Sequence, residues 1–362
     1  PYVVDYQTFV GQAAPIDFAS LVRGDMLKRG DNFAQIRVNL VGKGERSVES
    51  HEIVQKLYDQ LAPVRARFPS TFIKLFETPP GPPVRAQVMA ELVKDMEEVA
   101  RPGVILLNYT NPMAGVCYGL GRLSDVPYVG LCQGVQTTLD LISGYVDVPK
   151  AEIDYLCAGI NHMAWFLRLE HEGKDLYPLF KANCEKPEYY VNEKVRIETM
   201  RHFGYFVTES TPHMSEYVPY FRKRPDLLEQ YHLDYRSPSA EAPQHRRWES
   251  EERFGDEAAR KAAQEGPSNE YASRIIHSIE TNTLYRFNGN VANDGLIMNL
   301  EPGCCVEVPC MTDATGIRPC AIGELPPQLA GLNQSNVVVQ RLVAEAVLER
   351  DLEKAFMATA LD

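Results

Sequence analysis

Short apolar segments alternate with helical patterns through the first 155 residues, and this alternation limits the possible folds more than any other feature of the sequence. Strand-like patterns occur at residues 6–11, 36–41, 71–76, 104–108 and 126–132. Helical spacing of apolar residues occurs at residues 16–28, 47–61, 84–99 and 135–145. Strands that alternate with helices are typical of βαβ units, in which the strands form a parallel sheet. We therefore expect an α/β fold for this part of the chain, with a parallel sheet flanked by helices.

The pattern changes after residue 153. Strand patterns now mix irregularly with helical ones. Strand patterns occur at residues 164–170 and 305–309, and helical patterns occur at residues 189–203 and 333–359. Residues 225–263 are highly charged and poor in apolar side chains, which indicates a helical surface segment or a flap. We expect two domains, with a boundary between residues 155 and 156 and a second, α+β lobe from residue 156 to 362.

The composition excludes several classes of protein. The chain has 362 residues, enough for two lobes with a large core, and its net charge of −12 argues against nucleic acid or an anionic membrane as a partner. No apolar run approaches the roughly 18 residues of a membrane helix, and we expect a cytoplasmic protein. Four of the eight cysteines, Cys304, Cys305, Cys310 and Cys320, lie in an apolar stretch. Because their spacing does not match a zinc knuckle, we interpret them as reduced cysteines of the core.

Cys132 and His162 are the strongest candidates for a functional site. Each follows a segment that resembles the end of a buried strand, and ligands bind at strand ends in open α/β sheets. A thiolate and an imidazole are ligands that a divalent transition metal prefers. The alternatives are a cysteine that only packs in the core and a histidine that only hydrogen-bonds in a loop.

Several motifs occur in one order and at spacings that resemble a known family. They read LNYTNPMA at 107–114, GLCQ at 130–133, CAGINHMAW at 157–165, GYFVTES at 204–210, HMSEY at 213–217, NVANDGLI at 290–297 and GCCVEVPC at 303–310. From Leu106 onward the chain resembles the NAD- and manganese-dependent glycoside hydrolases of family 4. It is most similar to their α-galactosidase (melibiase) branch.

The resemblance implies a Rossmann-like domain with a second α+β lobe, as in lactate and malate dehydrogenases. It implies a homodimer or homotetramer that cleaves a small α-glycoside with NAD and Mn²⁺ as cofactors. In such enzymes the sugar is oxidised at C3, a base removes the C2 proton, the aglycone is eliminated, water adds and the ketone is reduced. This family is an exception to the usual two-carboxylate scheme. Cys132 and His162 match its metal ligands.

The resemblance also assigns candidate substrate contacts. Asn111 and Asn161 match positions that touch sugar hydroxyls or frame the metal, although an Asn-Pro pair equally well forms a turn. His213 is a further metal or substrate contact. Asn293 and Asp294 complete the site or simply form a turn.

Two catalytic positions follow from the same comparison. Tyr217 is the preferred general base, with a tethered core tyrosine as the alternative. Gln133 stands where the α-galactosidase branch has His and the phospho-glycosidase branch has Asp. Because glutamine cannot act as an acid, departure of the aglycone requires another group. Asn269 likewise replaces an expected arginine, for which Arg274 is a poorly matched substitute.

The predicted cofactor loop departs from the family. Gly11, Gln12 and Ala13 occupy the place of the glycine-rich strand–turn–helix that binds a dinucleotide pyrophosphate, and of its small positions only Gly11 is retained. The segment before Asn108 is also shorter than in the family. Three explanations are open: NAD binds through the remaining backbone amides, the protein is a non-hydrolytic relative that binds sugar or metal without NAD, or the sequence is an incomplete record.

Overall fold

The computed structural model describes residues 3–12, 29–40, 48, 53, 56–57, 60–67, 82–233, 270–349 and 351–361. The chain forms two compact units. The first contains Pro1–Gly81 with Tyr235–Gln244, and the second contains Pro82–Asp234 with His245–Asp362. The division into domains at residue 155 stays a prediction. Among the described helices, none combines the length and the apolar character needed to cross a bilayer.

The first unit contains a two-stranded antiparallel sheet. Strand β1 (Val3–Gln12) pairs with β2 (Arg29–Leu40), from Val3 opposite Leu40 to Gln12 opposite Arg29, and the short helix α3 is Ala62–Arg67. The expected parallel βαβ pairing is therefore wrong for these two strands. Alternation with period two identifies a strand but not the direction of its partner. The predicted elements at residues 16–28 and 71–76, and most of the one at 47–61, lie outside the described residues.

The second unit is built on an eight-stranded sheet. Its order is β3-β4-β8-β9-β5-β6-β7, with β10 beside β9. The strands are β3 Leu106–Asn108, β4 Tyr128–Gly130, β5 Asp154–Ile160, β6 Met163–His171, β7 Lys174–Asp175, β8 Tyr285–Ala292, β9 Cys305–Asp313 and β10 Gly316–Pro319. Strands β3 and β4 are parallel, whereas the other described pairs of this sheet are antiparallel. A sheet flanked by helices confirms the α/β class, and the pairing of β5 with β6 confirms the antiparallel strand expected at residues 164–170.

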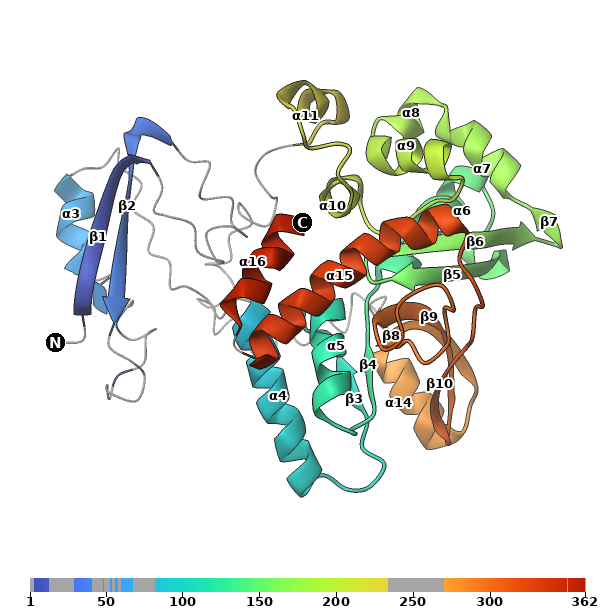
Figure 1. The fold of residues 1–362 in the computed structure, drawn as a ribbon. Coiled ribbons are helices and arrows are strands. Elements are labelled where there is room, and N and C mark those ends of the chain that lie inside the picture. The colour runs from blue at the N-terminus through green and yellow to red at the C-terminus, as the bar shows by residue number, and fades with distance from the viewer. Residues whose placement is uncertain are drawn as a thin grey trace. The chain divides into compact units, whose positions relative to one another are not determined.

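Helices surround this sheet (Figure 1). They are α4 Pro82–Val99, α5 Met113–Leu123, α6 Gly134–Val146, η3 Lys150–Glu152, α7 Tyr177–Cys184, α8 Pro187–Tyr190, α9 Lys194–Phe203, α10 Thr211–Tyr217, α11 Pro225–Tyr231, α14 Ala272–Thr281, α15 Pro327–Glu349 and α16 Leu352–Leu361. Helix α15 contacts α4, α5 and β5, and α14 contacts β8 and β9.

Helix α6 shows how the sequence specifies packing around the site. Val135, Leu139, Ile142 and Val146 recur at helical spacing and are all buried, in one cluster with Phe180 of α7. Burial of each such side chain contributes about 1.5 to 3 kcal/mol. This anchoring fixes the first residue of α6 and, with it, the loop that carries Cys132.

Two predicted helices are each divided into two. Residues 189–203 belong to α8 and α9, and the predicted helix at 333–359 is divided between α15 and α16. The second division has a local cause, because the Asp351 carboxylate accepts hydrogen bonds from the backbone N–H groups of Glu353 and Lys354 and so begins a new helix. Of the charged segment 225–263, the structure describes α11 and two following residues, and the remainder lies outside the described part.

Candidate metal centre

Cys132, His162 and Glu209 come together in the second unit. One ligand atom from each side chain lies within 4.8 Å of the others. The carboxylate Oε1 of Glu209 lies 3.4 Å from Nε2 of His162 and 3.8 Å from Sγ of Cys132. The structure thus brings together the predicted pair, and it adds a carboxylate that the sequence analysis did not single out.

Cys132 and His162 follow strands that are not neighbours in the sheet. Cys132 follows β4, and His162 lies in the tight turn between β5 and β6, with φ of 64°. Strands β8 and β9 lie between β4 and β5 in the sheet. These strands come from more than a hundred residues later in the chain, and no local pattern indicates where they insert.

Glu209 is held close to the other two side chains by the local backbone. Two residues before Glu209, Val207 forms a β-bridge with Trp165 of β6, and α10 begins two residues after Glu209. The φ of Glu209 is 72°, in the left-handed region. Gly134, the first residue of α6, leaves room for its carboxylate, because a Cβ there would lie 2.8 Å from Glu209 Oε1. A single acidic residue between an apolar segment and a helix start was the available sequence signal, and it is a weak one.

The electrostatics of the cluster favour a cation. Burial, followed by the charge of Glu307, raises the pKa of the Cys132 thiol to about 12. Glu307 of β9 is itself buried, its Oε1 has no hydrogen-bond partner among the described residues, and burial followed by the charge of Glu209 raises its pKa to about 8. Within the described ranges no lysine or arginine pairs with Glu209 or Glu307. A bound cation would stabilise both the thiolate and the carboxylates.

The donor set fits a divalent transition metal. Thiolate, imidazole and carboxylate together suit ions of intermediate softness. Burial lowers the pKa of His162, although the Glu209 carboxylate opposes this effect, so the imidazole is available in its neutral, ligating form. The Tyr271 hydroxyl of the α14 start hydrogen-bonds the Cys132 carbonyl and so fixes the loop.

Helix α10 brings two more predicted residues to His162. The His213 ring nitrogen Nε2 lies 2.8 Å from His162 Nδ1, and the Tyr217 hydroxyl lies 3.3 Å from the same atom. His213 therefore contacts the ring nitrogen of His162 that does not face Glu209. A hydrogen bond with Glu216 raises the pKa of His213.

Asn161 and Gln133 also lie beside the cluster. The Asn161 side chain is buried, and its Nδ2 has no hydrogen-bond partner within the described residues. Gln133 is exposed at the start of α6 and makes no capping hydrogen bond.

Three other predicted contacts have local roles. The Asn111 side-chain oxygen Oδ1 accepts a hydrogen bond from the backbone N–H of Met113 at the start of α5, as the turn alternative predicts. Asn293 is buried and bonds the backbone of residues 297, 300 and 301, and Asp294 follows it in an exposed turn. No described contact joins Asn293 or Asp294 to the cluster. The Asn293 side chain organises this loop, as the turn alternative predicts, and a substrate role for Asn293 and Asp294 stays a prediction.

The predicted cofactor loop begins in the first unit. Gly11 and Gln12 are the last residues of β1, and Gln12 pairs with Arg29. Strand β1 thus ends one residue beyond the predicted strand at residues 6–11, and its pairing with β2 shifts register between Val10 and Gln12. Ala13 lies outside the described residues.

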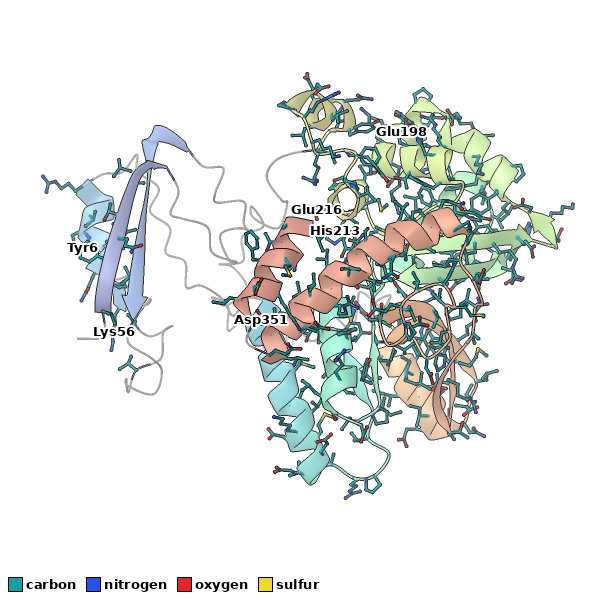
Figure 2. The ribbon with its side chains drawn as sticks, viewed as in Figure 1. Tyr6, Lys56, Glu198, His213, Glu216 and Asp351 are labelled. Carbon is teal, nitrogen blue, oxygen red and sulfur yellow. The ribbon has the colours of Figure 1, made fainter. Side chains whose placement is uncertain are left out.

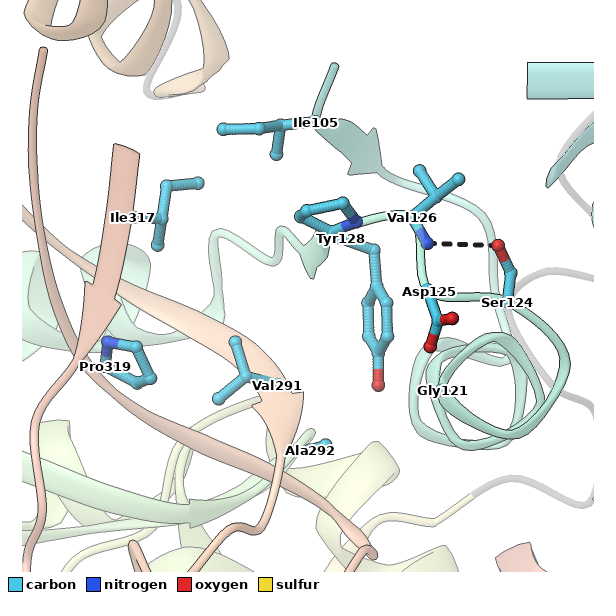
Figure 3. Close-up of a pocket in the computed structure, with 11 residues that line it drawn as sticks. Ile105, Gly121, Ser124, Asp125, Val126, Tyr128, Val291, Ala292, Ile317 and Pro319 are labelled. Atoms are coloured by element: carbon cyan, nitrogen blue, oxygen red, sulfur yellow. Dashed lines mark hydrogen bonds between the residues drawn. The ribbon is translucent and has the colours of Figure 1, made fainter. Parts of the chain in front are cut away.

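A separate hollow lies at the other end of β4 (Figure 3). It is lined mainly by apolar side chains, including Ile105, Tyr128, Val291, Ile317 and Pro319. None of the predicted site residues lines it. All eight cysteines are free, and Cys304, Cys305 and Cys310 are buried as expected, whereas Cys320 is half-buried.

The mixed sheet and the donor cluster define a candidate metal-dependent α/β enzyme. Two family models match: the one described as family 4 glycosyl hydrolase covers residues 85–148, and the one described as family 4 glycosyl hydrolase C-terminal domain covers residues 157–362. The chain belongs to glycosyl hydrolase family 4.

Known proteins of this family are similar over most of the chain. An α-galactosidase of Bacillus subtilis is 41% identical over 282 residues, which are 76% of this chain and 64% of that protein. An α-galactosidase of Rhizobium meliloti is 36% identical over 76% of this chain and 58% of its own length. The chain thus spans about three fifths of the length of these relatives. The structure of a 6-phospho-α-glucosidase from gut microorganisms, in complex with NAD and Mn²⁺, matches with a TM-score of 0.59 at 22% identity, over 76% of this chain and 66% of that one.

Proposed function

We propose that this chain provides the metal- and sugar-binding part of a glycosidase that cleaves α-galactoside-like substrates by an NAD- and Mn²⁺-dependent oxidation, elimination, addition and reduction. The observation that carries the proposal is the cluster of Cys132, His162 and Glu209 with Tyr217 at the same imidazole. Two relatives named α-galactosidase support the substrate class, and the neighbour solved with NAD and Mn²⁺ supports the cofactors.

The three clustered side chains would hold the Mn²⁺. When bound, a divalent cation supplies Lewis-acid polarisation of substrate oxygens. The protein residues do the rest. Tyr217 accepts the sugar proton as general base, since its hydroxyl lies beside the cluster. The buried Asn161 Nδ2, which has no partner among the described residues, donates to a sugar hydroxyl. Gln133 is exposed and cannot supply the proton for the leaving group.

When bound, NAD accepts and returns a hydride. Gly11 and Gln12 end strand β1, and residues 13–28, which would complete a strand–turn–helix loop, lie outside the described part of the chain. A cytoplasmic location fits the eight free cysteines. The homodimer or homotetramer stays a prediction.

Hydrolysis of p-nitrophenyl α-galactoside by the full chain tests the proposal, with NAD and Mn²⁺ added together and separately. We expect turnover only when both are present. Turnover that is unaffected by removal of Mn²⁺ with a chelator would contradict it.

The altered glycine loop, in which only Gly11 is retained of the small positions, favours a second candidate function, in which the protein binds sugar or metal without NAD-dependent turnover. Calorimetric titration with NAD, with and without Mn²⁺, separates the two. NAD binding supports the glycosidase, whereas Mn²⁺ binding without any NAD binding supports the second candidate.

A further inference from the structure

A chain of polar contacts leads from the cluster into helix α10. His162 Nδ1 lies 2.8 Å from His213 Nε2, and the other ring nitrogen of His213, Nδ1, lies 3.1 Å from the Glu216 carboxylate. The second carboxylate oxygen of Glu216 lies 3.4 Å from a guanidinium nitrogen of Arg222. Because His213 and Glu216 are three residues apart on a helix, their side chains share one face, and both are labelled in Figure 2.

The chemistry of imidazole fixes the direction of these hydrogen bonds when a metal is bound. Nε2 is the ring nitrogen of His162 that faces Glu209, and if its lone pair binds the metal, the ring proton must reside on Nδ1. Nδ1–H then donates to Nε2 of His213, which must be unprotonated to accept. His213 in turn keeps its proton on Nδ1 and donates it to the Glu216 carboxylate. The tautomer of the His162 ring therefore determines the tautomer of the His213 ring.

We propose that His213 and Glu216 are positioning residues that fix the tautomer and the ring orientation of His162 for metal binding. This inference rests on the proposed metal site. Partners of this kind, which hydrogen-bond the second nitrogen of a ligating histidine, raise its basicity and prevent rotation of its ring. Arg222 holds the Glu216 carboxylate in place at the other end.

The arrangement also couples metal binding to the base. The Tyr217 hydroxyl lies 3.3 Å from the same His162 Nδ1. Tyr217 directly follows Glu216 in α10. One short helix therefore sets both the orientation of the ligand and the position of the phenol. A change at Glu216 is expected to reach the cluster through His213, while the Tyr217 ring stays packed against the core cluster.

The affinity of the full chain for Mn²⁺, measured by calorimetry, tests the inference with paired variants. His213→Leu should lose roughly ten- to a hundredfold in Mn²⁺ affinity, the usual effect of removing such a partner. His213→Gln should retain most of it, because the amide oxygen accepts from His162 Nδ1–H at a similar reach. Asp226→Asn is the control, because it breaks an exposed ion pair between Arg224 and Asp226 at the start of α11. This variant should bind Mn²⁺ as the parent does.

A double-mutant cycle separates positioning from a structural role. Glu216→Ala should lower Mn²⁺ affinity in the parent, but it should have no further effect in the His213→Gln background, where no tautomer remains to be selected. An equal loss in both backgrounds would show that Glu216 acts through Arg222 or helix stability, and it would overturn the inference. Parent-like affinity of His213→Leu would overturn it too.

Different results are expected if the proposed metal site itself is wrong. If the parent does not bind Mn²⁺, or if Cys132→Ala and His162→Ala bind it as well as the parent does, the proposed function fails and the inference fails with it. If binding requires Cys132 and His162 but is indifferent to His213 and Glu216, only the positioning role is wrong.

Discussion

Replacement of Gly134 by alanine tests whether the Glu209 carboxylate belongs to the metal centre. The added Cβ would lie 2.8 Å from Glu209 Oε1 and 3.5 Å from Cys132 Sγ. Because the nearest atom is the end of a flexible side chain, the carboxylate should move aside at little cost in folding free energy. The contact of a charged oxygen with the metal would then be lost. One such interaction is worth about 1.5 to 3 kcal/mol, or roughly ten- to a hundredfold in affinity.

The assay is Mn²⁺ affinity by calorimetry, with the melting temperature measured in parallel. Gly144→Ala is the matched control, since it lies in the same helix and its Cβ would meet nothing within 4 Å. The control should bind Mn²⁺ normally and gain stability of about 1 kcal/mol from helix propensity. Unchanged Mn²⁺ affinity in Gly134→Ala would refute the assignment of Glu209 as a ligand.

Three further outcomes are expected. Tyr217→Phe should abolish turnover of substrates with poor leaving groups but leave Mn²⁺ affinity nearly intact, because only the phenol is removed; steady-state kinetics and calorimetry check this. The folded-state pKa of Glu307, about 8, is raised from 4.5, so its contribution to stability is present below pH 4.5 and is lost as pH rises through 8. Glu307→Gln should remove this loss, at most about 5 kcal/mol, from urea unfolding measured between these pH values. Arg196→Ala removes the ion-pair partner of the buried Glu193 carboxylate, at 2.7 Å, and should destabilise the fold by about 3 to 5 kcal/mol in the same assay.

The sequence predicted the local elements of the second unit better than their pairing. Val135, Leu139, Ile142 and Val146 define α6 by their spacing alone, and the helix lies where expected. The position of β8 and β9 between β4 and β5 could not be predicted, because it depends on contacts between segments far apart in the chain. The direction of β2 relative to β1 was mispredicted for a similar reason, since a strand pattern looks the same in parallel and antiparallel pairs.

The candidate site shows the same division. Cys132 and His162 could be selected because thiol and imidazole have distinctive chemistry. Glu209 could not, because acidic residues are common, and its role depends on a left-handed backbone and on the missing side chain of Gly134. For Asn293 the sequence left a substrate contact and a turn open, and the structure shows that backbone groups of its own loop occupy its amide.

The most direct test of the central claim is the absorption spectrum of the full chain loaded with Co²⁺ in place of Mn²⁺. A cation held by Cys132, His162 and Glu209 should give one Co²⁺ per chain and a thiolate-to-metal charge-transfer band in the near ultraviolet, because the Cys132 sulfur would be a direct ligand. Cys132→Ser should lose the band, and a chelator should abolish it in the parent. Co²⁺ bound without the band, or a band that persists in Cys132→Ser, would contradict the proposed centre.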